Sequence, residues 1–267
     1  MKPLVFDLHA AGVLAPGLNA LAQLREACRG ERTIRPEPLV LPPPPQLPAA
    51  ERRRSSQAVR LALACIAQTL EACALDPAEL RSVFATDEGT GEICQQMLEA
   101  LATTRQISPL VFTNSVHNAP SGYFSIGWHN RQPATVVSLG LESFASGLLC
   151  AVTDAVATGQ PVLLVVCDPA MTAPLDEVLP VVQPTAAALV LSAAGAGQPA
   201  LGRFRLALEP AAEEPSPLPA WLPAAWSGNS SARALAALGL LEQAAGTVQR
   251  FSLNGLLLAL AREEQCA

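Results

Sequence analysis

The chain has 267 residues, of which 50% are hydrophobic and 15% are charged, so it can bury a sizeable core and is not a disordered protein. Its formal net charge of −6 leaves no broad basic face for phosphates, which argues against a nucleic-acid partner. The seven cysteines form no CxxC pair, and several lie in apolar patterns, so we expect reduced, buried thiols and no zinc or other metal site.

The N-terminal segment predicts a strand at 3–9 and a helix at about 17–29. Its short apolar run is interrupted by Asp7 and His9, which does not fit a signal peptide, and no run of 18 apolar residues predicts a membrane span. We therefore expect a cytoplasmic protein. Residues 35–48 contain seven prolines and are expected to form an extended surface loop, with a polyproline ligand as the alternative.

The next part of the chain alternates between the two kinds of secondary structure. Helical spacing of apolar residues covers 49–76, a strand is expected at 81–86, and a second helix at 92–104. The turn between the strand and the second helix contains Gly89 and Gly91, but it lacks the lysine and the full glycine spacing of a phosphate-binding loop.

Further alternation follows up to residue 210. Helices are expected at 115–129 and 142–159, and strands at 134–140, 161–167, 184–194 and 201–210. The helix at 142–159 is small or apolar on nearly every face and therefore belongs inside the protein. Residues 231–265 are expected to form one or two amphipathic helices and a short strand. This alternation predicts a layered α/β fold with a mixed central sheet and helices on both faces.

The junction between the strand at 134–140 and the following helix is where α/β enzymes often place a nucleophile. Here it contains no cysteine. Ser143 is the nearest hydroxyl, but no basic partner lies near it in sequence, so the default interpretation is a cap or a small packing residue.

The stretch "ISPLVFTNSVHNAPSGYFSIGWHNRQPATVVSLGLES", residues 107–143, resembles the lead-in to the active-site cysteine of the β-ketoacyl-acyl-carrier-protein synthases, which have the thiolase-like fold. The resemblance extends over about 50–195 and includes "VFATDEGTGE". Eight positions match the family pattern without a gap: Ile107, Ser108, Pro109, Asn118, Gly122, Ser125, Ile126 and Pro133.

The chain departs from that family in two ways. The ungapped match puts Leu141 where the family has its cysteine. The family is also an internal duplication with two catalytic histidines in its second half, whereas this chain resembles the N-terminal half alone, and His9, His117 and His129 lie outside the histidine motifs. The resemblance thus implies a single thiolase-like half domain over 1–267, with 201–267 as a C-terminal strand and helix extension, no catalytic residue, and no cofactor.

The resemblance is strongest to the cysteine-less, chain-length-factor-type subunits of aryl polyene and related pigment biosynthesis. It implies a heterodimer with a full-length synthase through the strand containing Thr135, Val136, Val137 and Ser138. It also implies that Val111, Phe112 and Ser115 face the partner's acyl tunnel.

Two alternatives remain open at this point. The chain could be a thiolase-fold acyltransferase or hydrolase that uses Ser143 or Glu142. It could instead be a docking scaffold for an acyl carrier protein, with the basic run Arg52, Arg53 and Arg54 as the contact; the default interpretation of that run is a solvated helix end. We likewise expect packing, turn or interface roles for His117, His129, Tyr123 and Trp128.

Overall fold

The strands form one mixed sheet of eight strands in the order β3-β2-β4-β5-β1-β6-β8-β7. The computed structural model describes residues 2–35, 37–197 and 199–264. Its strands are β1 Leu4–Leu14, β2 Arg81–Ala85, β3 Ala134–Val137, β4 Val162–Asp168, β5 Thr185–Ala193, β6 Gly202–Pro210, β7 Val248–Leu253 and β8 Leu256–Glu263. Strands β2, β3 and β4 run parallel to one another, and antiparallel pairing begins at β5.

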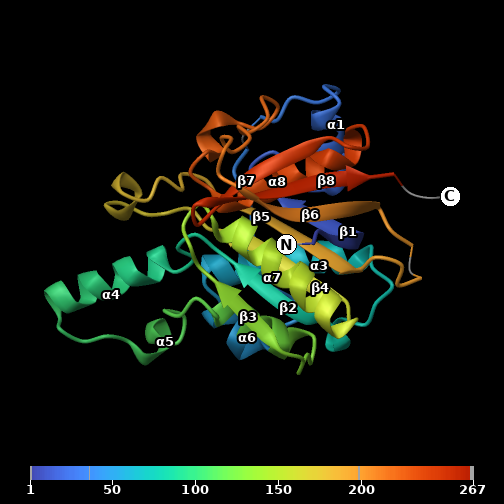
Figure 1. The fold of residues 1–267 in the computed structure, drawn as a ribbon. Helices are drawn as coiled ribbons and strands as arrows, with labels where there is room; N and C mark the ends of the chain where they lie inside the picture. Colours follow the sequence, from blue (N-terminus) through green and yellow to red (C-terminus); the bar gives the residue numbers. More distant parts are fainter. Residues whose placement is uncertain (1, 36, 198, 265–267) are drawn as a thin grey trace.

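Helices cover both faces of this sheet (Figure 1). They are α1 Leu21–Cys28, α2 Ala49–Arg54, α3 Gln57–Glu71, α4 Gly91–Thr103, α5 Pro109–Phe112, α6 Ala119–Gly127, α7 Ser143–Thr158 and α8 Ser230–Gly239. Short 3-10 turns lie at Pro77–Glu79, Leu175–Glu177, Ala224–Trp226 and Leu240–Glu242.

Strand β4 shows why the chain needs two layers of helices. Its side chains alternate between two apolar cores: Val162, Leu164 and Val166 face α7 and α8, while Leu163 and Val165 face α3 and α6. A strand that is buried on both faces reads as a continuous apolar run, as "VLLVVC" does.

The apolar helix expected at 142–159 is α7, and its environment explains its composition. The stretch Gly140–Thr158 is long and apolar enough to cross a membrane, yet half of it is buried in the fold. A Cβ on Gly147 would lie 2.8 Å from the Cβ of Ala85, so only glycine lets the helix approach β2 this closely. On its other side α7 packs against α8 and β7.

The helix expected at 49–76 is divided into α2 and α3. The division falls at Ser55 and Ser56, because the Ser56 hydroxyl accepts a hydrogen bond from Val59 N (3.3 Å) and begins a new helix there. In the same way, the helix expected at 115–129 is shorter, since α6 begins after Asn118 with Pro120 in its first turn.

The expectation for 231–265 was wrong in its second half. After α8 the chain forms the β7–β8 hairpin, whose two-residue turn is Asn254-Gly255, with φ of +47° and +75°. Both residues take positive φ as a type I′ turn requires, and Asn-Gly is the sequence that favours it. Strands β6, β8 and β7 thereby extend the sheet beyond β1.

Candidate functional site

The turn from β3 into α7 is the site to which the resemblance assigns a nucleophile. It is tight: Ser143 N donates to Gly140 O (3.0 Å), Glu142 N donates to Leu139 O (3.1 Å), and Gly140 has a φ of +57°. The side chains of Leu139 and Leu141 are 57% and 43% exposed. An aliphatic side chain at position 141 can neither attack a thioester nor hold an acyl group.

The two oxygen-bearing side chains next to Leu141 are engaged in the fold. Ser143 is fully buried, and its hydroxyl accepts a hydrogen bond from Leu139 N (2.8 Å). The Glu142 carboxylate accepts bonds from the Ser252 hydroxyl (2.7 Å) and from Asn254 N (2.8 Å). Ser143 therefore closes the turn, and Glu142 ties it to the tip of the β7–β8 hairpin.

Two aspartates meet where β2 and β4 end, and sequence reasoning did not single them out. Asp87 N donates to one oxygen of Asp168 (2.7 Å), and the other oxygen accepts from both Ser231 N and the Ser231 hydroxyl (2.6 Å each). The Ser138 hydroxyl, next to the turn, donates to Asp87 O (2.6 Å). The sequence carried one signal for this pair: Asp87 closely follows the apolar strand β2, and Asp168 ends the apolar strand β4.

Burial makes ionisation of this pair unfavourable. It raises the pKa of Asp87 to about 6, and the neighbouring charge of Asp168 acts in the same direction. Burial also raises the pKa of Asp168, while the hydrogen bonds from Ser231 oppose that rise. The hydrogen bonds of Asp168 to Asp87 N and to Ser231 hold the ends of β2 and β4 and the start of α8 together.

The histidines lie away from the turn. His9, on β1, has its ring nitrogens 2.9 Å from Pro199 O and 2.8 Å from the Ser192 hydroxyl. His117 precedes α6 and His129 follows it, and both are exposed. Within the described residues, no group of three His, Cys, Asp or Glu side chains could hold a metal ion. Cys65 and Cys167 are buried free thiols, as expected, but Cys150 is exposed, because it lies on the face of α7 that nothing in the described chain covers.

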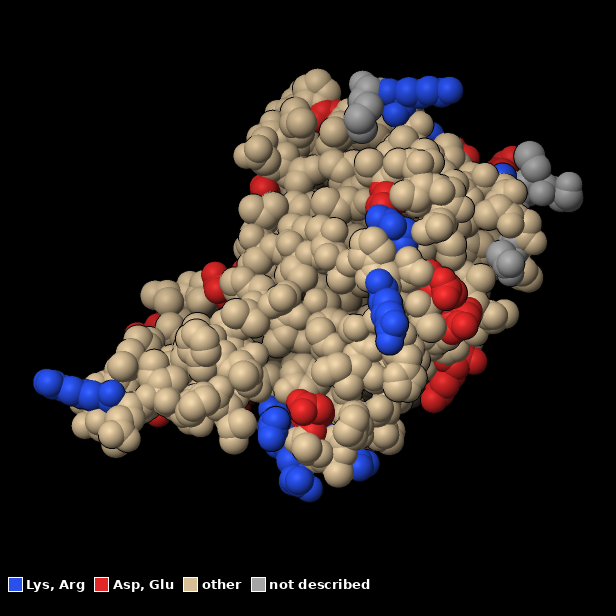
Figure 2. Space-filling view, turned by 90° about the horizontal axis from the view of Figure 1, so that it is seen from below, with Lys and Arg blue, Asp and Glu red and all other residues tan. Residues whose placement is uncertain are grey.

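The residues expected to face a partner's tunnel lie on an arm formed by α4 and α5, which projects from the body beside the β3 end of the sheet (Figure 1). Phe112 is 60% exposed and Val111 is half-buried, while the Ser115 hydroxyl donates to Phe112 O (2.8 Å). Figure 2 shows that most of this arm and the adjoining surface carry no Lys, Arg, Asp or Glu. Other exposed apolar side chains on the arm and just beyond it are Leu98, Leu101, Leu110 and Val116.

Strand β3, which contains Thr135, Val136 and Val137, is one edge of the sheet. It pairs with β2, and its backbone groups at Pro133 and Val137 bond to that strand. Because successive residues of a strand point their backbone groups to opposite sides, those of Ala134, Val136 and Ser138 face away from β2. β3 is therefore an edge strand that runs parallel to its one neighbour, and its side chains are exposed or half-buried.

The basic run lies on α2, at the base of the arm, where Asn114 Nδ2 donates to Arg54 O (3.2 Å). Arg52 and Arg53 line a groove of about 550 Å³ together with Arg60 and Pro43, the latter from the proline-rich loop. Arg54 instead lies 3.5 Å from the Glu51 carboxylate. The structure thus brings two of the three arginines together with Arg60, a residue that sequence reasoning did not single out.

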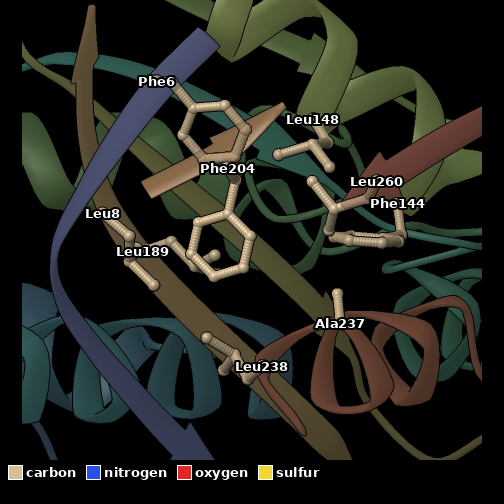
Figure 3. A pocket seen from close by; sticks show the side chains of 9 residues that line it. All are labelled: Phe6, Leu8, Phe144, Leu148, Leu189, Phe204, Ala237, Leu238 and Leu260. Carbon is tan, nitrogen blue, oxygen red and sulfur yellow. The ribbon is translucent and has the colours of Figure 1, made fainter. Parts of the chain in front are cut away.

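The interior between α7, α8 and the sheet holds a small apolar cavity (Figure 3). Its volume is about 10 Å³, and its walls include Phe6, Leu8, Phe144 and Phe204. Such a space is at the lower limit for a single water molecule and is lined by groups that offer it no hydrogen bonds. It is a packing defect of the core and has no room for an acyl chain.

A protein-family model covers most of the chain. Residues 27–223 match the model of the β-ketoacyl synthase N-terminal domain. The chain belongs to the β-ketoacyl synthase family. No curated protein sequence matches the chain. The mixed sheet flanked by helices is therefore a thiolase-like fold, as the sequence predicted.

Solved structures agree with this assignment. A chain in the complex of the ketosynthase ApeO with its chain length factor ApeC from Xenorhabdus doucetiae is 26% identical, with a TM-score of 0.71, and the match covers 97% of this chain and 100% of that one. A chain of AntDE:AntF, a type II polyketide ketosynthase with its acyl-carrier protein, is 14% identical, with a TM-score of 0.72 and coverages of 97% and 99%.

A β-ketoacyl synthase from Burkholderia phymatum matches this chain over a smaller part of its own length. It is 11% identical, with a TM-score of 0.58, and the match covers 80% of this chain but only 66% of the synthase. This β-ketoacyl synthase relative thus corresponds end to end to subunits found in ketosynthase complexes, and only in part to that synthase.

The Asp87 carboxyl provides a test of the polar cluster. The unfolded chain releases this proton near pH 3.8 and the folded protein near pH 6, so the free energy of unfolding should fall as the pH rises from about 4 to 6. We expect Asp87→Asn to remove that fall and to stabilise the protein by about 1–2 kcal/mol above pH 6, a value reduced for screening by nearby water. Urea denaturation at several pH values measures it. Asp176→Asn is the control, and an unchanged pH profile in Asp87→Asn would refute the assignment.

Proposed function

We propose that this chain is a catalytically inactive, chain-length-factor-type subunit that pairs with an active β-ketoacyl-acyl-carrier-protein synthase in the cytoplasm. The observation that supports the proposal is the exposed aliphatic side chain of Leu141, at the position to which the resemblance assigns the nucleophile. The oxygens of the neighbouring Ser143 and Glu142 are already engaged. By resemblance, the pathway is elongation of an aryl polyene or a related polyketide-like chain.

The pairing surface follows from two neighbouring features. The open edge of β3 offers unpaired backbone groups, which soluble proteins normally cover or pair. The adjacent arm exposes Phe112 and several leucines, an apolar surface of the kind found at protein interfaces. We therefore propose that β3 pairs with the corresponding strand of the synthase and that the arm lies against its body.

The same surface fits a role in setting chain length. The small cavity of the core cannot hold an acyl chain, so a growing chain has to lie in the synthase or at the shared surface. In this arrangement Val111, Phe112 and Ser115 line the end of the partner's tunnel. The chain, including residues 201–267, acts as a single half-size unit.

The pairing can be measured with a variant of the arm. Phe112→Asp places a charge in the proposed interface and should weaken the complex with a co-expressed synthase at least tenfold, because a buried unpaired charge is costly. Val40, which is 83% exposed on the proline-rich loop, gives the control Val40→Asp. Size-exclusion chromatography and binding titration report the complex. A free wild-type monomer that leaves the synthase activity unchanged would disprove the proposal.

A catalytic role of this chain alone is the main alternative, through Ser143 or Glu142. Since both side chains hold the turn together, we expect no covalent adduct when the purified chain is incubated with acyl-CoA or acyl-carrier thioesters. Intact-mass spectrometry detects the added acyl mass, and Ser143→Ala and Glu142→Gln serve as controls. An adduct on the wild-type chain that either variant loses would establish an enzyme instead.

A contact with an acyl carrier protein is the second alternative and is compatible with pairing. Its support is the groove lined by Arg52, Arg53 and Arg60, because carrier proteins are acidic and a cluster of guanidinium groups attracts them. Arg52→Glu with Arg53→Glu should weaken carrier binding at least tenfold at low salt, while Arg131→Glu, an exposed residue between α6 and β3 that does not line the groove, should not. Fluorescence anisotropy with a labelled carrier protein measures both, and equal binding would exclude this surface.

A further inference from the structure

A second pocket lies between α8, β7 and the loop that precedes α8. It has a volume of about 210 Å³, and its lining includes Arg233, Gln249, Phe251, Leu218 and Ala236. Its volume equals that of about seven water molecules at roughly 30 Å³ each. The pocket exists partly because Ala236, one helical turn after Arg233, leaves space beside the guanidinium.

Arg233 is an unusual residue for this position. It lies in the first turn of α8, where a positive charge opposes the helix dipole. Arg233 is half-buried, and its Nη1 donates to Asn229 O (2.9 Å) and to Ser227 O (3.2 Å), both neutral carbonyls. Within the described part of the chain it forms no ion pair, and its Nε and second amino group donate no hydrogen bond.

The nearest acidic groups do not neutralise Arg233 directly. Asp168 binds Ser231, which precedes Arg233 by two residues and is therefore about 200° away around the helix. Both Asp168 and Asp87 act on Arg233 only at a distance, and burial lowers the pKa of the guanidinium. A half-buried cation without an ion-pair partner is stabilised by an anion bound at its free face.

Gln249 supplies the second polar group. It lies on the same face of β7 as the buried Phe251 and Leu253, where the strand pattern otherwise places apolar residues. The side-chain oxygen of Gln249 is buried and has no hydrogen-bond partner. Because the oxygen and nitrogen of an amide exchange by a 180° rotation, Gln249 can equally turn its NH2 group toward an anion held by Arg233.

From these contacts we infer that the Arg233 pocket binds a small organic carboxylate. Arg233 and Gln249 hold the carboxylate, and Phe251, Leu218 and Ala236 enclose a compact apolar body, such as a single ring. The volume excludes a long acyl chain. This inference does not depend on the proposed pairing with a synthase.

Binding of sodium benzoate to the full-length chain tests the inference. Benzoate should raise the melting temperature in a saturable way and should give a single-site isotherm by calorimetry, because a ligand that binds the folded state stabilises it. Benzamide, the neutral analogue, and inorganic phosphate, an anion without an apolar body, should each bind at least tenfold more weakly. Saturable binding of phosphate but not benzoate would overturn the assignment of ligand class.

Variants locate the site. Arg233→Gln should weaken benzoate binding at least tenfold, and Arg131→Gln, outside the pocket, should leave it unchanged. Since Arg233 also bonds the start of α8, Leu218→Trp, which fills the pocket from the loop, provides a second variant that keeps the guanidinium. Undiminished benzoate binding in Leu218→Trp, or no saturable binding by the wild-type chain, would overturn the inference.

Discussion

The burial of the first half of α7 governs this structure. A helix that is apolar or small around its whole circumference requires cover beyond the sheet. The C-terminal part of the chain supplies that cover at the start of α7: the Phe144 ring meets Phe251 edge to face at 5.0 Å, and Phe144 N donates to the Ser230 hydroxyl (2.7 Å). Further along the helix, Cys150 and Val156 stay exposed. Glu142 adds polar bonds to the same hairpin. Because the start of α7 is fixed in this way, the preceding turn is fixed too, and Leu141 is held at its exposed apex.

Local sequence patterns were enough to predict much of this fold. The strands at 81–86 and 161–167 and the helix at 142–159 were identified within one or two residues of β2, β4 and α7, since continuous apolar runs and buried helices leave strong signals. The β7–β8 hairpin was missed although Leu253-Asn254-Gly255-Leu256 carries the signal for a type I′ turn. From the sequence we expected one or two helices and a short strand over 231–265 without placing them, and only the turn signal could have located the two strands.

Sequence patterns alone do not identify polar residues that come together only through the strand order of the sheet. The assignment of Leu141 rests on positions that match without a gap along the chain. Asp87 and Asp168 are 81 residues apart, and they meet only because β2 and β4 are neighbours in the sheet. Arg233 of α8 and Gln249 of β7 line one pocket for a similar reason. In each case the strand order, which depends on long-range packing, brings the polar groups together.

The two edges of the sheet complete the physical case for a partner. At the β7 edge the chain protects itself: Ser216 N donates to Arg250 O (2.8 Å), and Arg250 N donates to the Ser216 hydroxyl (3.0 Å), so the preceding loop satisfies outward-facing backbone groups. At the β3 edge the arm turns away instead and leaves Val136 accessible while exposing Phe112 beside it. In a monomer, an uncovered edge strand next to an apolar arm would favour aggregation, whereas in a complex both would be buried. The same sheet is therefore covered at one edge by its own chain, whereas the other edge is the one on which the proposed pairing rests.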